Sequence, residues 1–346
     1  MSGGVDSSVS AVLLKEQGYE VIGLHMRTGI ETPDSEHGKP TCCSLADADD
    51  ARNVAAAFDI PFYVLNFEKE FRSVIDYFCR EYDHARTPNP CIMCNQELKF
   101  GKLLWYADVC DAAWIATGHY ARVEHTAERH RLLRGVDSSK DQAYALFSLT
   151  QERLARALFP LGSLQKTEIR QIALERNLKV KHKRESQEIC FVPDHDHGRL
   201  LRELLGDRMQ PGPVVDTEGN HLGTHGGVQL FTIGQRRGLG IAVGEPRYVV
   251  DLRRKTNTVV LGSNDDLMRT ELVAEGVNWS SIEPPGEPLE GQVQIRYKHK
   301  GAPATIEPLD GDRVRVLFKT PVRAITPGQA AVFYQGDLVL GGGWIR

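Results

Sequence analysis

The first residues of the chain combine two glycines, an aspartate and neighbouring hydroxyls in the segment Ser2–Ser8 (SGGVDSS). Gly3 and Gly4 can adopt backbone conformations closed to other residues, so their amides can turn toward a ligand. An amphipathic stretch follows directly, and the N-terminus of a helix attracts anions. The Gly-Lys-Ser/Thr ending of a Walker A loop is absent. We therefore expect a phosphate-binding turn of another kind, with a simple capped glycine turn as the alternative.

A second group of residues capable of chemistry is the pair Cys91 and Cys94, in the segment ARTPNPCIMCN. Cysteines at this spacing occur in zinc sites, but a site of four cysteines needs a second close pair. The adjacent Cys42 and Cys43 match that requirement poorly. Structural zinc is therefore disfavoured, while thiol chemistry and a pair of inert small residues both remain open.

A third candidate is Cys190, in the segment RESQEICFVPD. Lys181, Lys183 and Arg184 precede it closely. Positive neighbours lower the pKa of a thiol from about 8.5 and increase the thiolate fraction. The alternative is a lone buried cysteine before an apolar Phe-Val pair, and the sequence around Cys190, taken alone, favours that alternative.

The elements that must position these residues alternate in type through the first half of the sequence. We expect helices at residues 7–17, 45–58, 68–82, 95–107, 141–159 and 166–177, and strands at 19–26, 61–67 and 112–118. Strand and helix in turn predict an α/β fold with a doubly wound parallel sheet and helices on both faces.

The texture of the sequence changes after about Asp196. Glycine-rich segments and short β-like runs come first, and five further runs between residues 271 and 343 alternate with glycine, proline and aspartate. This pattern predicts a small antiparallel β-barrel. We expect three domains: an α/β domain at 1–195, a small central domain at 196–264 and a C-terminal β-barrel at 265–346.

The composition restricts the class of protein. The chain has 346 residues, a net charge of −4 and seven cysteines. No apolar run approaches the roughly 18 residues of a membrane helix, and no basic segment precedes an apolar one, so we expect a soluble, cytoplasmic protein without a membrane partner. In such a chain, cysteines favour metal or thiol chemistry over a disulfide framework. A nucleic-acid partner would need local basic patches, for which GQRRGLG and RYKHK are the candidates.

Together these segments resemble the tRNA-specific 2-thiouridylases, pyrophosphatase-loop ATP enzymes of the bacterial type. The resemblance covers essentially the whole chain. It depends on the following motifs, which occur in the family's order: SGGVDSS, ARTPNPCIMCN, ATGHYA, LLRGVDSSKDQ, SQEICFV, TIGQRRGLGI, RYVV, RYKH and TPGQAAVFY followed by LGGG. The combination is far more specific than any one motif.

The resemblance implies an adenine nucleotide alpha hydrolase-like catalytic domain and an RNA-binding barrel. It implies a transferase that adenylates the C2 oxygen of wobble uridine 34 of tRNA. Sulfur then comes from a cysteine persulfide, giving 2-thiouridine, AMP and pyrophosphate. The implied cofactors are ATP and Mg²⁺. The implied partners are tRNA and a sulfur donor, either a persulfide relay protein or a cysteine desulfurase.

The resemblance also implies roles for individual residues. Cys94 matches the nucleophile and Cys190 the cysteine that carries the persulfide and later forms a disulfide with Cys94. The residues matching ATP contacts are Met1, Ser2, Gly3, Gly4, Val5, Asp6, Ser7, Ser8, Met26 and Gly118. The residues matching contacts to tRNA or its target base are Asn89, Pro90, Cys91, His119, Lys140, Asp141, Gln142, Arg296, Tyr297 and Gln329.

Several of these assignments have alternatives. Asp6 is the candidate ligand of Mg²⁺. Cys91, Cys94 and Cys190 are candidate ligands of a [4Fe–4S] cluster. Some relatives have aspartate at the position of Cys91, so the cysteine favours a cluster more in this chain than in those relatives. His119 is otherwise expected as a buried core histidine, and the segment 140–142 as a polar helix cap.

Two further expectations concern the whole chain. Relatives have a buried strand before the loop, whereas this sequence starts at the loop, so we expect the first central strand of the 1–195 domain to be missing and its neighbours' edges to be exposed. The alternative functions are another adenylating enzyme that modifies tRNA or a small molecule, and a non-catalytic RNA-binding relative. The β-rich second half and its basic patches favour a large RNA acceptor.

Overall fold

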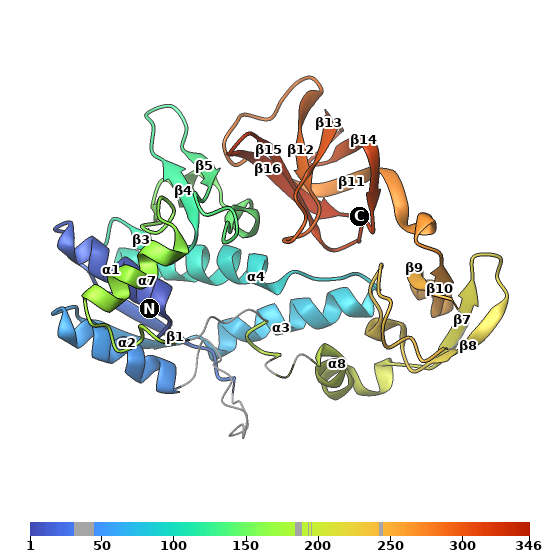
Figure 1. Cartoon of the computed structure of the whole chain (residues 1–346), viewed down its shortest axis with the longest axis horizontal. Coiled ribbons are helices and arrows are strands. Elements are labelled where there is room, and N and C mark those ends of the chain that lie inside the picture. Colours follow the sequence, from blue (N-terminus) through green and yellow to red (C-terminus); the bar gives the residue numbers. More distant parts are fainter. Residues whose placement is uncertain (31–44, 184–188, 193, 195, 242–244) are drawn as a thin grey trace. The chain divides into compact units, whose positions relative to one another are not determined.

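The structure is a computed structural model and describes residues 1–30, 45–183, 189–192, 194, 196–241 and 245–346 (Figure 1). The predictions for Cys42, Cys43 and Arg184 therefore lie outside the described residues. The chain divides into two compact units. The first contains residues 1–74, 91–195 and 337–339, and the second contains 75–90, 196–336 and 340–346.

The first unit begins with alternating helices and strands. The elements are α1 (Val5–Glu16), β1 (Gly23–Arg27), α2 (Leu45–Ala57), β2 (Phe62–Asn66) and α3 (Glu68–Asp83), the last of which runs on into the second unit. β1 and β2 are parallel, with Gly23 opposite Phe62. Within the described ranges, the chain enters α1 without a preceding strand. The apolar face of α1, including Val9 and Val12, packs against Ile169 in a buried core.

The middle of the sequence completes the first unit. Its elements are α4 (Pro90–Met93), the π-helix η1 (Cys94–Lys102), α5 (Leu103–Val109), β3 (Ile115–Ala116), β4 (Ala121–Glu124), β5 (Arg131–Arg134), the 3₁₀ helix η2 (Ala143–Leu146), α6 (Gln151–Leu154), β6 (Ala157–Leu158) and α7 (Lys166–Glu175). β3 and β6 form a second parallel pair. The described parallel strands of the first unit thus form two two-stranded sheets.

The expected single helix at 141–159 is wrong. This stretch contains η2, then α6, then β6. Thr150 has an extended backbone and caps a new helix by accepting a hydrogen bond from the amide of Arg153. Ala157 and Leu158 then pair with β3, so a strand contact distant in sequence overrides the local helical spacing.

The second unit opens with a small α/β arrangement. Its elements are α8 (His197–Leu205), η3 (Gly206–Arg208), β7 (Gly212–Asp216), β8 (His221–His225), η4 (Val228–Leu230), β9 (Tyr248–Arg253), η5 (Arg254–Thr256), β10 (Thr258–Gly262) and η6 (Asp265–Leu267). The strands form one sheet in the order β8-β7-β10-β9. Val214, Val249 and Val259 are buried in its core.

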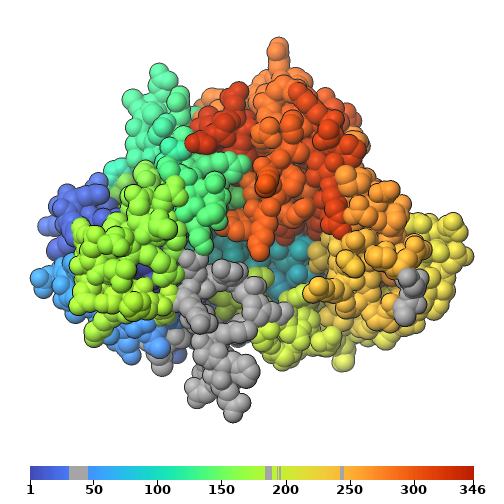
Figure 2. All heavy atoms as spheres, viewed as in Figure 1, coloured from blue at the N-terminus to red at the C-terminus, as the bar shows by residue number. Residues whose placement is uncertain are grey.

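Six antiparallel strands form a barrel at the C-terminal end. They are β11 (Met268–Asn278), β12 (Leu289–Gln294), β13 (Ala302–Pro308), β14 (Val314–Arg323), β15 (Ala330–Gln335) and β16 (Leu338–Ile345). They follow the order β11-β14-β13-β12-β15-β16, and pairing of β11 with β16 closes the barrel. Its atoms form one closely packed body, coloured orange to red in Figure 2. This closed pairing confirms the expected antiparallel barrel. Buried residues alternate with exposed ones along β13 and β14, as expected of strands with one face toward the interior.

None of the helices in these described ranges has the length and apolar character needed to cross a bilayer.

Candidate functional site

The loop before α1 has the backbone of an anion-binding turn. Gly3 has φ +76°, and a Cβ there would lie 2.2 Å from the carbonyl oxygen of Asp47, so only glycine fits. Gly4 is the N-cap residue of α1 and supplies no side-chain cap. The hydroxyl of Ser8 is buried without a hydrogen-bond partner among the described residues. Helix amides without a side-chain cap and an unsatisfied hydroxyl are the donors that a phosphate group would accept.

Asp6, in the first turn of α1, is held by two side chains that sequence analysis missed. Its Oδ1 accepts hydrogen bonds from the Tyr120 hydroxyl and the Lys166 ammonium, each at 2.7 Å. Lys166 is only 8 % exposed, and its amide donates to Asp137. A buried cation therefore lies beside the loop, where it neutralises the carboxylate of Asp6. The motif ATGHYA contained a signal for Tyr120, whereas only the packing of α7 on α1 reveals Lys166.

The structure brings Gly118 to the same loop. A Cβ at Gly118 would lie 2.9 Å from the carbonyl carbon of Asp6 and from the amide nitrogen of Ser7. Glycine thus allows the chain after β3 to approach the first turn of α1 closely. Met26, which also matches an ATP contact, is half-buried near the end of β1.

The two cysteines of the 91–94 segment differ in environment. Cys91 is exposed on α4, whereas Cys94 is half-buried at the first position of the π-helix η1. The next residue, Asn95, is buried, donates to the carbonyl of Ala145 at 2.9 Å and accepts from Lys99 at 3.0 Å. π-Helical turns occur frequently at functional sites. Asn95 therefore fixes the start of the helix that presents Cys94.

His119 lies in the interior of the first unit. It is 7 % exposed, its Nδ1 is 2.7 Å from the Thr117 hydroxyl, and its ring lies near those of Phe100 and Phe159. Burial and then the charge of Lys99 hold the pKa of His119 well below its ordinary value. This is the environment of the core histidine that we gave as the alternative to an RNA contact.

Cys190 lies in a turn of its own. The amide of Val192 donates to the carbonyl of Ile189, and Phe191 packs edge-on against Phe71 at 5.8 Å. Phe191 and Val192 are buried, whereas Cys190 is only half-buried. The turn thus anchors the chain directly after a partly accessible thiol.

The positive charge expected near Cys190 has other partners. Lys183 donates to Asp47 and Asp50 of α2, each at 2.6 Å. Burial opposes the charge of Lys183, but these two bonds outweigh it and raise its pKa. Lys181 bonds to Asn177. The charge of Lys183 is therefore already balanced, which weakens its expected effect on the thiol.

The segment 140–142 has internal roles. Asp141 accepts from Arg134 at 2.7 Å and from the amides of Gly135 and Ala143. The side chain of Gln142 accepts from the amide of Tyr120 at 3.0 Å. Lys140 is half-exposed. Only the bond from Ala143 to Asp141 reaches the helix η2, because the side chain of its N-cap residue, Gln142, makes no cap bond.

In the second unit, the barrel carries Arg296 and Tyr297 just after β12. Tyr297 is exposed, and the carbonyls of both residues accept hydrogen bonds from the Gln294 amide. Arg296 donates to the carbonyl of Arg323 at 3.1 Å. The remaining predicted barrel contact, Gln329, donates to two main-chain carbonyls, those of Thr87 and Pro88.

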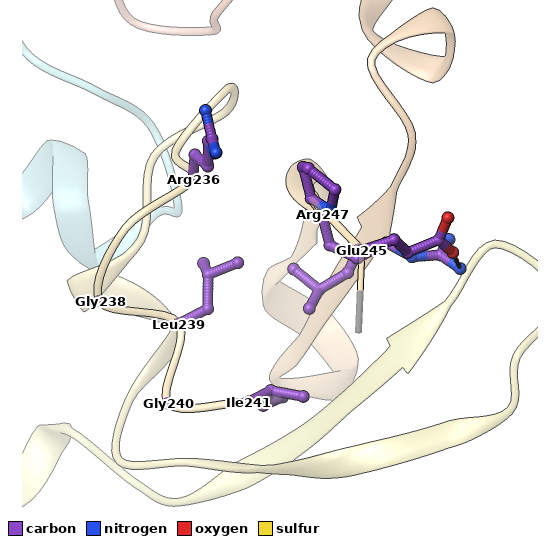
Figure 3. A pocket seen from close by; sticks show the side chains of 9 residues that line it. Arg236, Gly238, Leu239, Gly240, Ile241, Glu245 and Arg247 are labelled. Atoms are coloured by element: carbon purple, nitrogen blue, oxygen red, sulfur yellow. Dashed lines mark hydrogen bonds and ion pairs between the residues drawn. The ribbon is translucent and has the colours of Figure 1, made fainter. Parts of the chain in front are cut away.

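The GQRRGLG segment lines a surface pocket of about 460 Å³, shown in Figure 3. Arg236 and Arg247 contribute positive charge, and Glu245 pairs with Arg247. The pocket contains none of the residues implied for ATP. GQRRGLG, the first of the two predicted basic patches, therefore lies beside the four-stranded sheet, because Leu261 of β10 lines the same pocket.

Comparison with known proteins divides the chain into three matched segments. The tRNA methyl transferase HUP domain matches residues 1–194, the tRNA methyl transferase PRC-barrel domain matches 199–263, and the aminomethyltransferase beta-barrel domain matches 269–345. The tRNA-specific 2-thiouridylase MnmA of Clostridium perfringens is 51 % identical over 347 residues, covering 100 % of this chain and 97 % of the relative. The chain belongs to the tRNA-specific 2-thiouridylase family.

Other relatives agree. The tRNA-specific 2-thiouridylase MnmA of Clostridium kluyveri is 49 % identical and covers 100 % of this chain and 97 % of its own. Among solved structures, NMN synthetase from Francisella tularensis aligns with a TM-score of 0.34 at 15 % identity. The alignment covers 54 % of this chain and 63 % of that one. The family matches confirm the expected fold class: a nucleotide alpha hydrolase-like α/β domain, a small central domain and a β-barrel.

Proposed function

We propose that this protein is an ATP-dependent tRNA-uridine 2-sulfurtransferase that converts wobble uridine 34 of tRNA into 2-thiouridine. The observation that carries the proposal is the similarity over the whole chain, 51 % identity, to a tRNA-specific 2-thiouridylase. The loop at Gly3–Ser8 supports the use of ATP, because its backbone and the unsatisfied Ser8 hydroxyl offer donors to phosphate.

The first half of the reaction activates the base. The C2 oxygen of uracil is a poor leaving group, so it attacks the α-phosphorus of ATP and becomes an adenylate. The bond from that phosphorus to the bridging oxygen breaks, and pyrophosphate leaves with the electron pair. The loop amides bind the departing pyrophosphate, and Lys166 offsets the negative charge of the Asp6 carboxylate beside the loop.

Asp6 is the residue that would hold Mg²⁺. It is a carboxylate in the first turn of α1, and oxygen ligands of this type suit that ion. When bound, Mg²⁺ neutralises charge on the phosphates. The bonds from Tyr120 and Lys166 fix Asp6 Oδ1, so the orientation of the carboxylate is set by the protein itself.

The second half transfers sulfur. A sulfur-donor protein loads Cys190 as a persulfide. In one route, the terminal sulfur attacks C2, AMP leaves, and Cys94 then attacks the Cys190 sulfur to release the thiolated base. In the other, Cys94 first attacks the persulfide and releases sulfide, which attacks C2. Either route leaves a Cys94–Cys190 disulfide, which a reductant opens.

The alternative to a persulfide is a [4Fe–4S] cluster on Cys91, Cys94 and Cys190, whose three thiolates would bind three different irons. Across the described ranges, no three histidine, cysteine, aspartate or glutamate side chains lie close enough together to bind a single metal ion. Anaerobic purification followed by iron analysis distinguishes the two: a persulfide enzyme contains no stoichiometric iron.

The proposal is tested by mass spectrometry of tRNA nucleosides after reaction of the purified protein with ATP, tRNA and a sulfide source. We expect 2-thiouridine and tRNA-dependent release of pyrophosphate, and neither with a tRNA that lacks a wobble uridine. Pyrophosphate release without 2-thiouridine would indicate another adenylating enzyme. Absence of both would indicate a non-catalytic RNA-binding protein.

A further inference from the structure

The segment Arg86–Pro90 leads directly into α4 and includes Asn89 and Pro90, two of the residues that match contacts to tRNA or its target base. It belongs to the second unit, as does the turn 326–329 (TPGQ) between β14 and β15 of the barrel. The two segments are about 240 residues apart in sequence but bonded to each other: the amide of Thr87 donates to the carbonyl of Pro327 at 2.8 Å.

Gln329 completes this contact. Its Nε2 donates to the carbonyl of Thr87 at 3.0 Å and to that of Pro88 at 3.1 Å. A side-chain amide nitrogen has two N–H groups, so these two carbonyls use both of its donors. The side chain of Gln329 is therefore directed at the main chain just before Asn89.

The turn lies against the segment main chain to main chain. Gly328 has φ +88°, and a Cβ there would lie 2.9 Å from the Thr87 carbonyl oxygen and from the Arg86 Cβ. The turn is itself bonded to the last strand of the barrel, because Gly328 donates to the carbonyl of Ile345 and Ile345 donates to that of Gln329. Any side chain at position 328 would push the segment away from the barrel.

Other groups hold the same segment. The Thr87 hydroxyl donates to that of Thr232 at 3.3 Å, and Thr232 also bonds to Tyr82. Burial raises the pKa of Tyr82 to about 12. Burial likewise raises the pKa of Tyr77, opposed in part by a hydrogen bond from the backbone of Asn89. Both phenols therefore stay neutral and keep these bonds across the physiological range.

We propose that the turn 326–329 is a positioning device for Asn89 and Pro90, and that Gln329 acts through the main chain of Thr87 and Pro88 rather than by contacting RNA. This inference rests on the proposed function. The turn follows β14, whose last residue, Arg323, accepts a hydrogen bond from Arg296. RNA bound at Arg296 is thereby linked to the segment that receives the base.

The test compares Gln329→Ala and Gly328→Ala with Gly336→Ala. Gly336 also has a positive φ, +60°, but nothing lies within 4 Å of its Cβ position, so this control introduces backbone strain without touching the segment. We expect both test variants to reduce kcat for tRNA-dependent pyrophosphate release by about 10- to 100-fold, because misplacement by about 1 Å has such an effect. The Kd for tRNA should stay within about twofold of the wild type.

Two kinetic outcomes would overturn the proposal. Loss of tRNA affinity in Gln329→Ala, with Gly328→Ala unaffected, would mean that Gln329 binds RNA directly. If kcat of Gln329→Ala and of Gly328→Ala equals that of the Gly336→Ala control, the turn does not position Asn89 and Pro90.

Hydrogen exchange supplies a measurement that does not depend on catalysis. The amide of Thr87 should exchange faster in Gln329→Ala and Gly328→Ala than in the wild type and in Gly336→Ala. Unchanged exchange in both test variants would overturn the proposal. A wild-type protein that forms no 2-thiouridine would contradict the proposed function, while this measurement would still decide whether the turn holds the segment.

Discussion

In the first unit, the loop before α1 is held by side chains: Lys166 and Tyr120 bind the carboxylate of Asp6. In the second unit, the segment 86–90 is held mainly through its own main chain, by Pro327 and Gln329. The two regions are therefore sensitive to different kinds of substitution. The loop depends on the charge of named side chains, whereas the segment depends on the backbone path of a distant turn.

The largest effect on activity should come from substituting the two thiols proposed to transfer sulfur. Cys94→Ser and Cys190→Ser should abolish 2-thiouridine formation, because a hydroxyl neither carries a persulfide sulfur nor forms the disulfide. Their tRNA affinity should equal that of the wild type in filter binding. The matched control is Cys110→Ser, an exposed cysteine outside the proposed mechanism, which should retain activity. Full thiolation by either test variant would refute the assigned roles.

The next largest effect tests the side-chain half of the comparison. Lys166→Met keeps most of the side-chain volume but removes the ammonium that pairs with the Asp6 carboxylate, beside the loop proposed to bind phosphate. We expect kcat/KM for ATP to fall on the order of tenfold to a hundredfold, with tRNA affinity unchanged. Tyr120→Phe removes one hydrogen bond to the same oxygen and should lower the free energy of unfolding by only about 1 kcal/mol. A Lys166→Met enzyme with normal ATP kinetics would remove Lys166 from the site.

A smaller effect is expected on the barrel. Arg296→Ala should weaken tRNA binding and reduce the slope of log K against log salt by at most about one, since one phosphate contact is lost. Arg313→Ala, an exposed arginine of the same barrel, is the control and should change neither quantity. An unchanged slope in Arg296→Ala would exclude that contact.

The smallest effect concerns pH. Burial holds the pKa of His119 below its unfolded value, so the native state disfavours the proton and the unfolded state binds it more readily. The contribution of the neutral His119 ring to the free energy of unfolding is therefore fully present above about pH 6.5 and decreases as the pH falls below that value. His119→Gln should show a smaller drop in melting temperature between about pH 7 and about pH 5. Equal drops in both proteins would mean that His119 is not buried in solution.

Sequence patterns predicted the barrel well because strands such as β13 and β14 alternate buried and exposed residues between turn residues, so the information is local. They failed at 141–159, where pairing of Ala157 with Ile115 replaces a helix. The loop glycines were visible for the same local reason. Lys166, 160 residues from Asp6, and Gln329, 242 residues from Thr87, were assigned no such role because only the folded chain brings these pairs together.

The most direct test of the proposed sulfur transfer is a single turnover of the enzyme carrying a persulfide on Cys190, with ATP and tRNA and without reductant. We expect one 2-thiouridine, one AMP and one pyrophosphate per persulfide, together with a Cys94–Cys190 disulfide in the peptide mass spectrum. Formation of 2-thiouridine with both cysteines still reduced, or complete absence of 2-thiouridine, would contradict it.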